Sequence, residues 1–122
     1  MRLSFKAPKA LEADLDWLSV TLGLSRPEII RRAVRETLDY IRERGELPST
    51  SYDPYGDGSW GLYLFTVRLD DRLYKELEGA AARLNVPMSE AARRAVYHYI
   101  ERKLRPYRGK YVSIYYGGLS SL

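Results

Sequence analysis

Apolar residues recur along the chain with two different periods, and the period changes in the same way in each half. Residues 2–7 and 63–69 alternate apolar and polar side chains, which is typical of a half-buried strand. From Leu11, and at the matching place in the second half, the apolar positions step at helical spacing. A second helical stripe follows from Ile29 and again from Ala91. The pattern predicts strand, helix, helix, twice over.

The two halves are copies related by a shift of 62 residues without a gap. When residues 2–42 are placed over 64–104, eight of the 41 paired positions are identical. The identical pairs are Leu11/Leu73, Leu15/Leu77, Leu22/Leu84, Glu28/Glu90, Arg31/Arg93, Arg32/Arg94, Ala33/Ala95 and Val34/Val96. Each copy has about 40 residues, too few to bury a core alone, so the two copies must share one.

Turn-forming residues divide the chain. Gly23 and Asn85 follow the first helical stripes, where a helix end favours a residue that tolerates the left-handed conformation. The Pro- and Gly-containing stretch after Arg44 is typical of an irregular linker, and its 17 residues can span about 56 Å, enough to join the units within one molecule. Exchange of strands between two chains is also geometrically open. We expect a first unit at 1–44, a linker at 45–61, a second unit at 62–104 and a tail at 105–122.

The composition is that of a soluble globular protein, with 45% hydrophobic and 30% charged residues. Because cysteine is absent, disulfides and thiolate metal sites are excluded, and we expect no cofactor. Neither an apolar run of membrane-spanning length nor a signal-peptide pattern is present, so we expect a cytoplasmic protein. The net charge of +4 permits a polyanionic partner. The linker has three acidic and no basic residues, whereas the tail has three basic and no acidic ones.

Strand, helix, a Leu-Gly-Leu-Ser-Arg turn and a second helix resemble the ribbon-helix-helix family, the fold of the Arc and MetJ repressors. The resemblance covers residues 2–42 and 62–104. It implies an antiparallel β-ribbon that enters the major groove of DNA above four intertwined helices. In most members the two copies are separate chains. Here we expect a mainly α fold with a short β-ribbon, in which tandem units form a single-chain pseudo-dimer.

The strand face opposite the core carries the candidate base-reading side chains. With Leu3, Phe5 and Ala7 facing inward, alternation places the other set outward. The six candidates are Arg2, Ser4 and Lys6 in the first strand and Leu64, Thr66 and Arg68 in the second. These chemistries suit guanine acceptors, several base edges and the thymine methyl group. The alternative interpretation is that these side chains are polar only because an exposed strand face contacts water. Since the two sets differ, we predict a non-palindromic DNA target.

The resemblance implies that the turn before each second helix grips a DNA phosphate through the helix N-terminus. In the first unit Ser25 and Arg26 match that place, and Ser25 also suits a plain helix cap. In the second unit Pro87, Met88 and Ser89 stand there, and proline offers neither a side-chain cap nor a backbone donor. The second phosphate contact is therefore expected to be weakened or shifted to Ser89.

Other polar and aromatic residues are assigned mainly structural roles. Arg31, Arg32 and their counterparts in the second copy are expected to solvate helix faces or form ion pairs. His98, the only histidine, is expected at the surface. Trp17 belongs to a second apolar strip on the first helix, with Ala13, Val20 and Leu24, which suggests cover by the linker, the tail or another molecule, or packing within its own domain.

The tail combines basic residues, tyrosines and a possible short strand at 111–116. Arg105, Arg108 and Lys110 are its candidate phosphate contacts. The tail can also add a strand to a neighbouring edge, pack back on its own units or support a homodimer. Packing or dimerisation is favoured slightly over contact with DNA.

The function predicted from these features is sequence-specific binding of double-stranded DNA by a transcriptional regulator, with repression favoured through the resemblance. No cluster of catalytic groups is visible, so we do not expect an enzyme, and no small-molecule ligand is evident. The DPYGDG segment lacks the ligand spacing of a calcium loop and favours a turn. The alternative is an antitoxin-type or assembly protein that acts mainly through protein–protein contacts.

Overall fold

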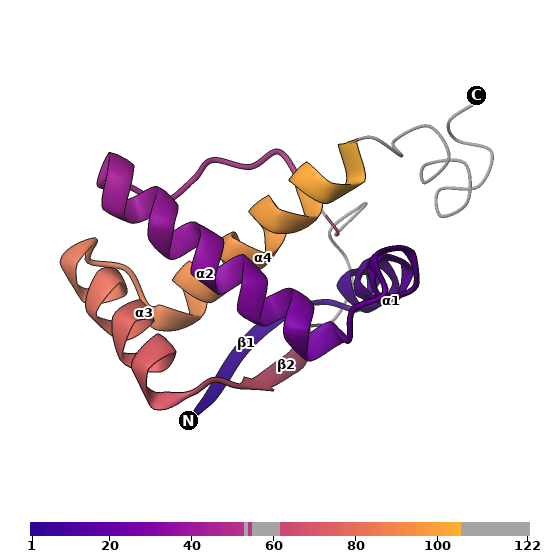
Figure 1. The fold of residues 1–122 in the computed structure, drawn as a ribbon, viewed down its shortest axis with the longest axis horizontal. Coiled ribbons are helices and arrows are strands. Elements are labelled where there is room, and N and C mark those ends of the chain that lie inside the picture. The colour runs from indigo at the N-terminus through magenta and orange to yellow at the C-terminus, as the bar shows by residue number, and fades with distance from the viewer. Residues whose placement is uncertain (53, 55–61, 106–122) are drawn as a thin grey trace.

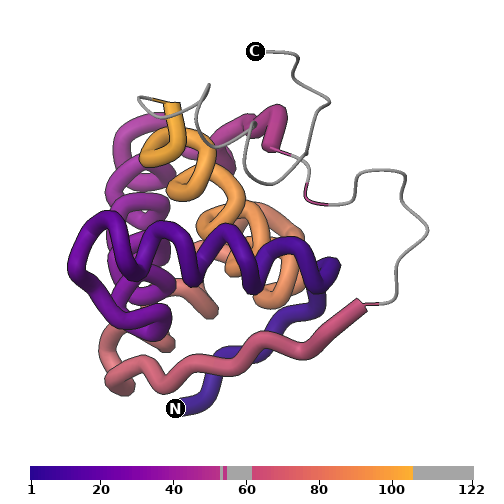
Figure 2. The backbone as a smooth tube through the Cα atoms, turned by 90° about the vertical axis from the view of Figure 1, so that its right-hand side faces the viewer, coloured from indigo at the N-terminus to yellow at the C-terminus, as the bar shows by residue number. Residues whose placement is uncertain are grey.

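A computed structural model describes residues 1–52, 54 and 62–105, arranged as a two-stranded ribbon beside four helices (Figure 1). The elements in chain order are β1 (Arg2–Pro8), α1 (Ala10–Leu22), α2 (Arg26–Arg44), β2 (Leu62–Arg68), α3 (Asp71–Arg83) and α4 (Met88–Leu104). Turned by a quarter, the molecule shows the ribbon lying along one side of the helices (Figure 2). The predicted order of strand, helix, helix, repeated once, is confirmed.

The two strands pair antiparallel within the one chain. Ser4 lies opposite Thr66 at the middle of the ribbon, with Arg2 opposite Arg68 on one side and Lys6 opposite Leu64 on the other. The 62-residue shift relates Ser4 to Thr66. The middle pair therefore lies on an approximate two-fold axis that exchanges the two halves.

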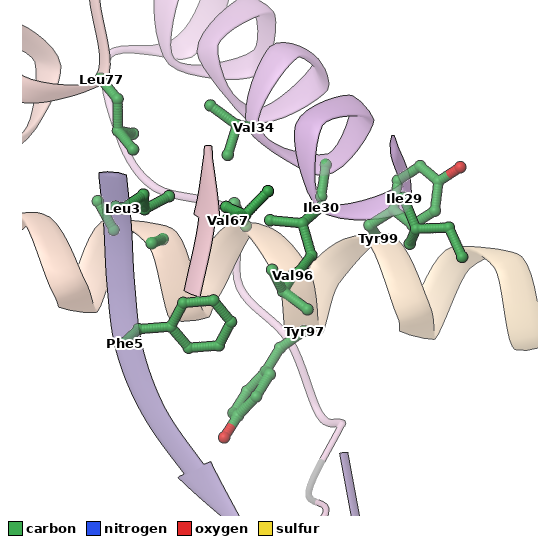
Figure 3. Packing of buried hydrophobic residues seen from close by; sticks show 14 of the residues in the cluster. Leu3, Phe5, Ile29, Ile30, Val34, Val67, Leu77, Val96, Tyr97 and Tyr99 are labelled. Atoms are coloured by element: carbon green, nitrogen blue, oxygen red, sulfur yellow. The ribbon is translucent and has the colours of Figure 1, made fainter. Parts of the chain in front are cut away.

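Both halves contribute to one hydrophobic core between the ribbon and the helices. Leu3 and Phe5 of β1 and Val67 of β2 point toward the helices, where Val34 of α2 and Val96 of α4 are buried (Figure 3). α2 and α4 contact each other, and each also contacts a strand of the opposite half. Neither half has this core without the other, which is the physical reason for the repeat.

The inward alternation predicted for β1 is confirmed, because Leu3, Phe5 and Ala7 are almost fully buried. β2 follows the same pattern less completely. Phe65 is half-buried and its ring stacks on Phe5 with 5.5 Å between centroids, whereas Tyr63 is exposed and lies under the Lys9 ammonium. In both strands every second side chain therefore faces the helices, but the inward side chains of β2 are less deeply buried than those of β1.

Helix ends confirm the turn residues expected from the sequence. Gly23 ends α1 with φ of 69°, and Asn85, the non-glycine residue with positive φ among those described, follows α3 with φ of 58°. Ser25 caps α2, where its hydroxyl oxygen accepts a hydrogen bond from the Glu28 amide at 3.2 Å. Pro87, at the start of α4, makes no side-chain cap. The predicted difference between the two turns is therefore present.

The linker residues described after α2 cross to the other half and reach α4 (Figure 1). The Thr50 hydroxyl donates to the Glu101 carboxylate at 2.7 Å, and the amide and hydroxyl of Ser51 donate to the same group. Desolvation by burial raises the pKa of Glu101, but these hydrogen bonds together outweigh it, so that the pKa lies below its ordinary value. The segment that follows α2 is thus held on α4 by hydrogen bonds.

A buried acid lies where the linker meets α1. Asp14 is 2% exposed, and the Tyr52 hydroxyl donates a hydrogen bond to its carboxylate. The Tyr52 ring also meets Tyr97 of α4 edge to face, with 5.2 Å between centroids. Burial raises the pKa of Asp14 from 3.8 to about 7. The linker therefore covers an acidic side chain of α1.

Trp17 is half-buried and packs against the shared core. The second apolar strip expected around it is not covered along its length, because Val20 is 86% exposed. His98 is half-buried rather than fully at the surface, with its ring 5.8 Å from Tyr40, and burial is the main cause that lowers its pKa. His98 packs within the fold because Tyr40 of the first half lies against it.

Candidate nucleic-acid interface

The six residues predicted to read bases share the outer face of the ribbon. Five are exposed, and Ser4, at the centre, is half-buried. The hydroxyl oxygens of Ser4 and Thr66 lie 3.0 Å apart and share a hydrogen bond across the two strands. Each of the two hydroxyl groups can still form further hydrogen bonds, and an outside group can use this capacity. The ribbon thus presents a hydroxyl pair at its middle.

The two ends of this outer face carry different chemistry. Arg2 faces Arg68 directly at one end, whereas Lys6 faces Leu64 at the other. β1 and β2 contain no acidic residue to offset these charges. Like charges directly opposite each other in a sheet destabilise it, and their Cβ atoms lie only about 5 Å apart. The face is therefore electrostatically suited to an anion, most strongly at the end with two arginines.

A pair of equivalent arginines holds the ribbon on the helices. The Arg31 Nε of α2 donates to the carbonyl oxygen of Arg68 at 2.9 Å, and the Arg93 Nε of α4 donates to the carbonyl oxygen of Lys6 at 2.7 Å. Both bonds join a helix of one half to the strand of the other. Each bond occupies a backbone carbonyl oxygen of the ribbon. Together they hold in place the two strands that carry the candidate base-reading residues.

The same set of ion pairs in both halves of the chain positions these arginines. Glu28 forms ion pairs with Arg31 and Arg32, and Glu90 does the same with Arg93 and Arg94. The sequence interpretation of these arginines as ion-paired residues is confirmed, but it missed their bonds to the ribbon. The available sign was the Glu-x-x-Arg-Arg pattern, which is identical in both copies although most surface positions differ.

The start of α2 adjoins β2 beside the candidate readers. A groove of about 350 Å³ lies between Arg26 of α2 and the β2 residues Leu64 and Thr66. Within it the Arg26 side chain forms ion pairs with Glu12 and Asp16 of α1, at 3.6 and 3.1 Å. Arg26 thus lies beside the β2 residues Leu64 and Thr66, and two carboxylates pair with its guanidinium group.

The start of α4 is the less polar of the two helix starts. Met88 takes the place of Arg26, and both Met88 and Ser89 are half-buried. Pro87 contributes neither a hydroxyl cap nor an N–H group. Any anion held there would depend on the backbone amides of the first helical turn. The ribbon is thus flanked by two unequal helix starts.

Several predictions fall at or beyond the edge of the described residues. Arg105 is exposed directly after α4, whereas Arg108, Lys110 and the possible strand at 111–116 lie outside the described residues. The DPYGDG segment also lies outside them except for Pro54. In the part of the chain that the structure describes, no group of three potential ligands could hold a metal ion, and no helix is long and apolar enough to cross a membrane.

Residues 63–103, about a third of the chain, match the family model described as ribbon-helix-helix protein, copG family. The matched segment contains most of β2, all of α3 and nearly all of α4, which is the second strand-helix-helix segment of the chain. Members of this family are generally DNA-binding transcription regulators, so the match supports a DNA-binding role. Searches of curated proteins and of solved structures found no match.

Proposed function

We propose that this chain is a single-chain pair of ribbon-helix-helix units that represses transcription by inserting the β1–β2 ribbon into the major groove of double-stranded DNA. The observation that carries the proposal is the outer face of the ribbon, where Arg2 stands directly opposite Arg68 with no acid in either strand. Their mutual repulsion is relieved when both guanidinium groups face an anion or the acceptor edge of guanine.

The register further supports a target with two unlike halves. Arginine makes paired hydrogen bonds to guanine, lysine also donates to guanine, and an apolar side chain contacts the thymine methyl group. The end with Arg2 and Arg68 is suited to guanines on both strands. The end with Lys6 and Leu64 is suited to one guanine and one thymine. Selection from random DNA is expected to return a non-palindromic site, and a perfect palindrome bound by one chain would contradict this assignment.

Contacts with the DNA backbone are proposed at the two helix starts. At α2 they are assigned to Ser25 and to Arg26, which lines a groove beside β2, and at α4 to Met88 and Ser89, of which Met88 is the counterpart of Arg26. Because α2 begins with the cation Arg26 where α4 begins with Met88, we expect the α2 start to contribute more of the phosphate binding. The tail cations Arg105, Arg108 and Lys110 remain candidates for further phosphate contacts.

Binding at two salt concentrations tests the DNA-binding role. Fluorescence anisotropy with the selected duplex is expected to show affinity falling by about 10³ to 10⁵ between 50 and 200 mM salt if about 6 to 10 phosphates are contacted. Absent binding, or binding that salt does not weaken, would contradict the proposal. That result would favour the alternative of an antitoxin-type or assembly protein.

A double substitution tests whether the ribbon reads bases. Arg2→Ala with Arg68→Ala is expected to reduce the preference for the selected duplex over random DNA about tenfold or more, because each well-formed arginine–guanine pair discriminates by about 1–3 kcal/mol. The matched control is Arg44→Ala with Lys103→Ala, which removes two cations that stack on tyrosines near the far ends of α2 and α4. The control should keep the preference, and equal losses in both variants would refute base reading by the ribbon.

A further inference from the structure

A groove of about 680 Å³ runs between the C-terminal half of α2 and the helix α3. Leu38 and Ile41 of α2 and Ala80 of α3 form its apolar floor, and charged side chains stand around its rim. Gly79 lines it without a side chain. This groove is a gap in the packing between the two halves of the molecule, beside α3.

The corresponding place in the first half is filled. The 62-residue shift relates Gly79 to Trp17, which packs against the core from α1. On the same helix Asp14, the counterpart of Glu76 at the rim of the groove, is covered by Tyr52 from the linker. On α1 this place therefore holds an indole and is covered by the chain that follows α2, whereas nothing among the described residues covers the α2–α3 groove in this way.

The approximate two-fold axis relates the linker after α2 to the tail after α4. In the first half the Ser51 hydroxyl donates to Glu101 of α4 at 2.9 Å. The shift of 62 residues relates Ser51 to Ser113 and Glu101 to Asp39, an exposed acid of α2. The chain thus contains a second serine–acid pair at the equivalent positions. Its acid, Asp39, lies on the helix beside the groove, and its serine, Ser113, belongs to the tail.

We propose that tail residues 106–122 dock in the α2–α3 groove of their own chain, as the linker docks on α1 and α4. Residues 111–122 carry no charged side chain and include Val, Ile and Tyr, which suits an apolar floor. The counterpart of Tyr52 is Ile114, ten residues beyond Leu104. Ten extended residues span about 33 Å, more than the roughly 26 Å length of α4, so the tail reaches the groove.

Disulfide formation in the full chain tests this docking, because the natural sequence contains no cysteine. One variant carries Arg83→Cys, at the groove, with Ile114→Cys in the tail. The matched control carries Thr21→Cys, the counterpart of Arg83 on α1, with the same Ile114→Cys. A tail that does not dock would reach either cysteine only at the roughly millimolar effective concentration of a flexible tether. Docking predicts that the first pair oxidises within the monomer at least about tenfold faster than the control, without any DNA present.

Filling the groove provides the second arm of the test. A Cβ atom at Gly79 would contact only the flexible end of Arg83, at 3.4 Å, so Gly79→Trp restores the residue found at the equivalent place on α1. This change is expected to slow oxidation of the Arg83→Cys pair to the control rate, and Gly79→Leu replaces it if circular dichroism shows unfolding. Equal rates for the two cysteine pairs, disulfides only between chains, or no effect of filling the groove would overturn the proposal. DNA binding by the ribbon would stand in each case.

Discussion

One buried carboxyl group, that of Asp14, is expected to contribute more to the stability of this protein as the pH falls from 7 to 5. Asp14 is 2% exposed, and burial raises its pKa to about 7 from an ordinary value of 3.8. Folding therefore favours the protonated carboxyl. The stabilisation is fully present below the pKa of the unfolded chain and is lost as the pH rises through about 7.

The size of the effect follows from the two pKa values. Between them folding takes up one proton at Asp14, so the free energy of unfolding falls by about 1.4 kcal/mol per pH unit. Allowing for partial ionisation near pH 7, raising the pH from 5 to 7 is expected to remove about 2 kcal/mol. His98 acts in the opposite sense, because its pKa is lowered and its stabilisation is lost as the pH falls. A comparison of variants therefore isolates Asp14.

Asp14→Asn supplies that comparison, since the amide keeps the size of the side chain and an oxygen that accepts from Tyr52 but does not ionise. Urea unfolding followed by circular dichroism at pH 5, 6, 7 and 8 is expected to show the variant gaining about 2 kcal/mol on the wild type between pH 5 and 7. Glu78→Gln, which removes an exposed carboxyl from α3, is the matched control. Parallel curves for wild type and Asp14→Asn would show that Asp14 ionises normally in the fold and refute the reasoning.

Three further changes test the packing and the support of the ribbon. Leu77→Ala, in the fully buried part of α3, should lower the free energy of unfolding in urea by about 2–5 kcal/mol. Ser25→Ala should lower the free energy of unfolding by about 1 kcal/mol in the same assay, because the α2 cap is lost. An unchanged free energy of unfolding would show that the Ser25 hydroxyl does not stabilise α2 as a cap. Arg93→Ala should speed hydrogen exchange in β1 by about tenfold, because it removes the bond to the Lys6 carbonyl, worth about 1.5 kcal/mol. Unchanged exchange would mean that this bond does not hold the strand.

The elements were predictable because their determinants are local. Alternation placed Leu3 and Phe5 inside, and a residue tolerant of positive φ marked the helix end at Gly23. The ungapped repeat indicated two copies of one unit. The burial of Asp14 was not predictable, because an aspartate is seldom buried without a partner, and only the crossing of the linker brings the Tyr52 hydroxyl to it.

For the candidate interface, the sequence by itself determined which six side chains share the outer face of the ribbon, since side-chain direction alternates strictly along a strand. It did not determine which of them stand opposite each other. Only the pairing of β1 with β2 placed Arg2 against Arg68 and Lys6 against Leu64. Register depends on how both strands fit over a core built from both halves, and on arginines that reach from each helix to the other unit's strand. Such contacts join residues far apart in the chain, so only the tertiary structure could decide them.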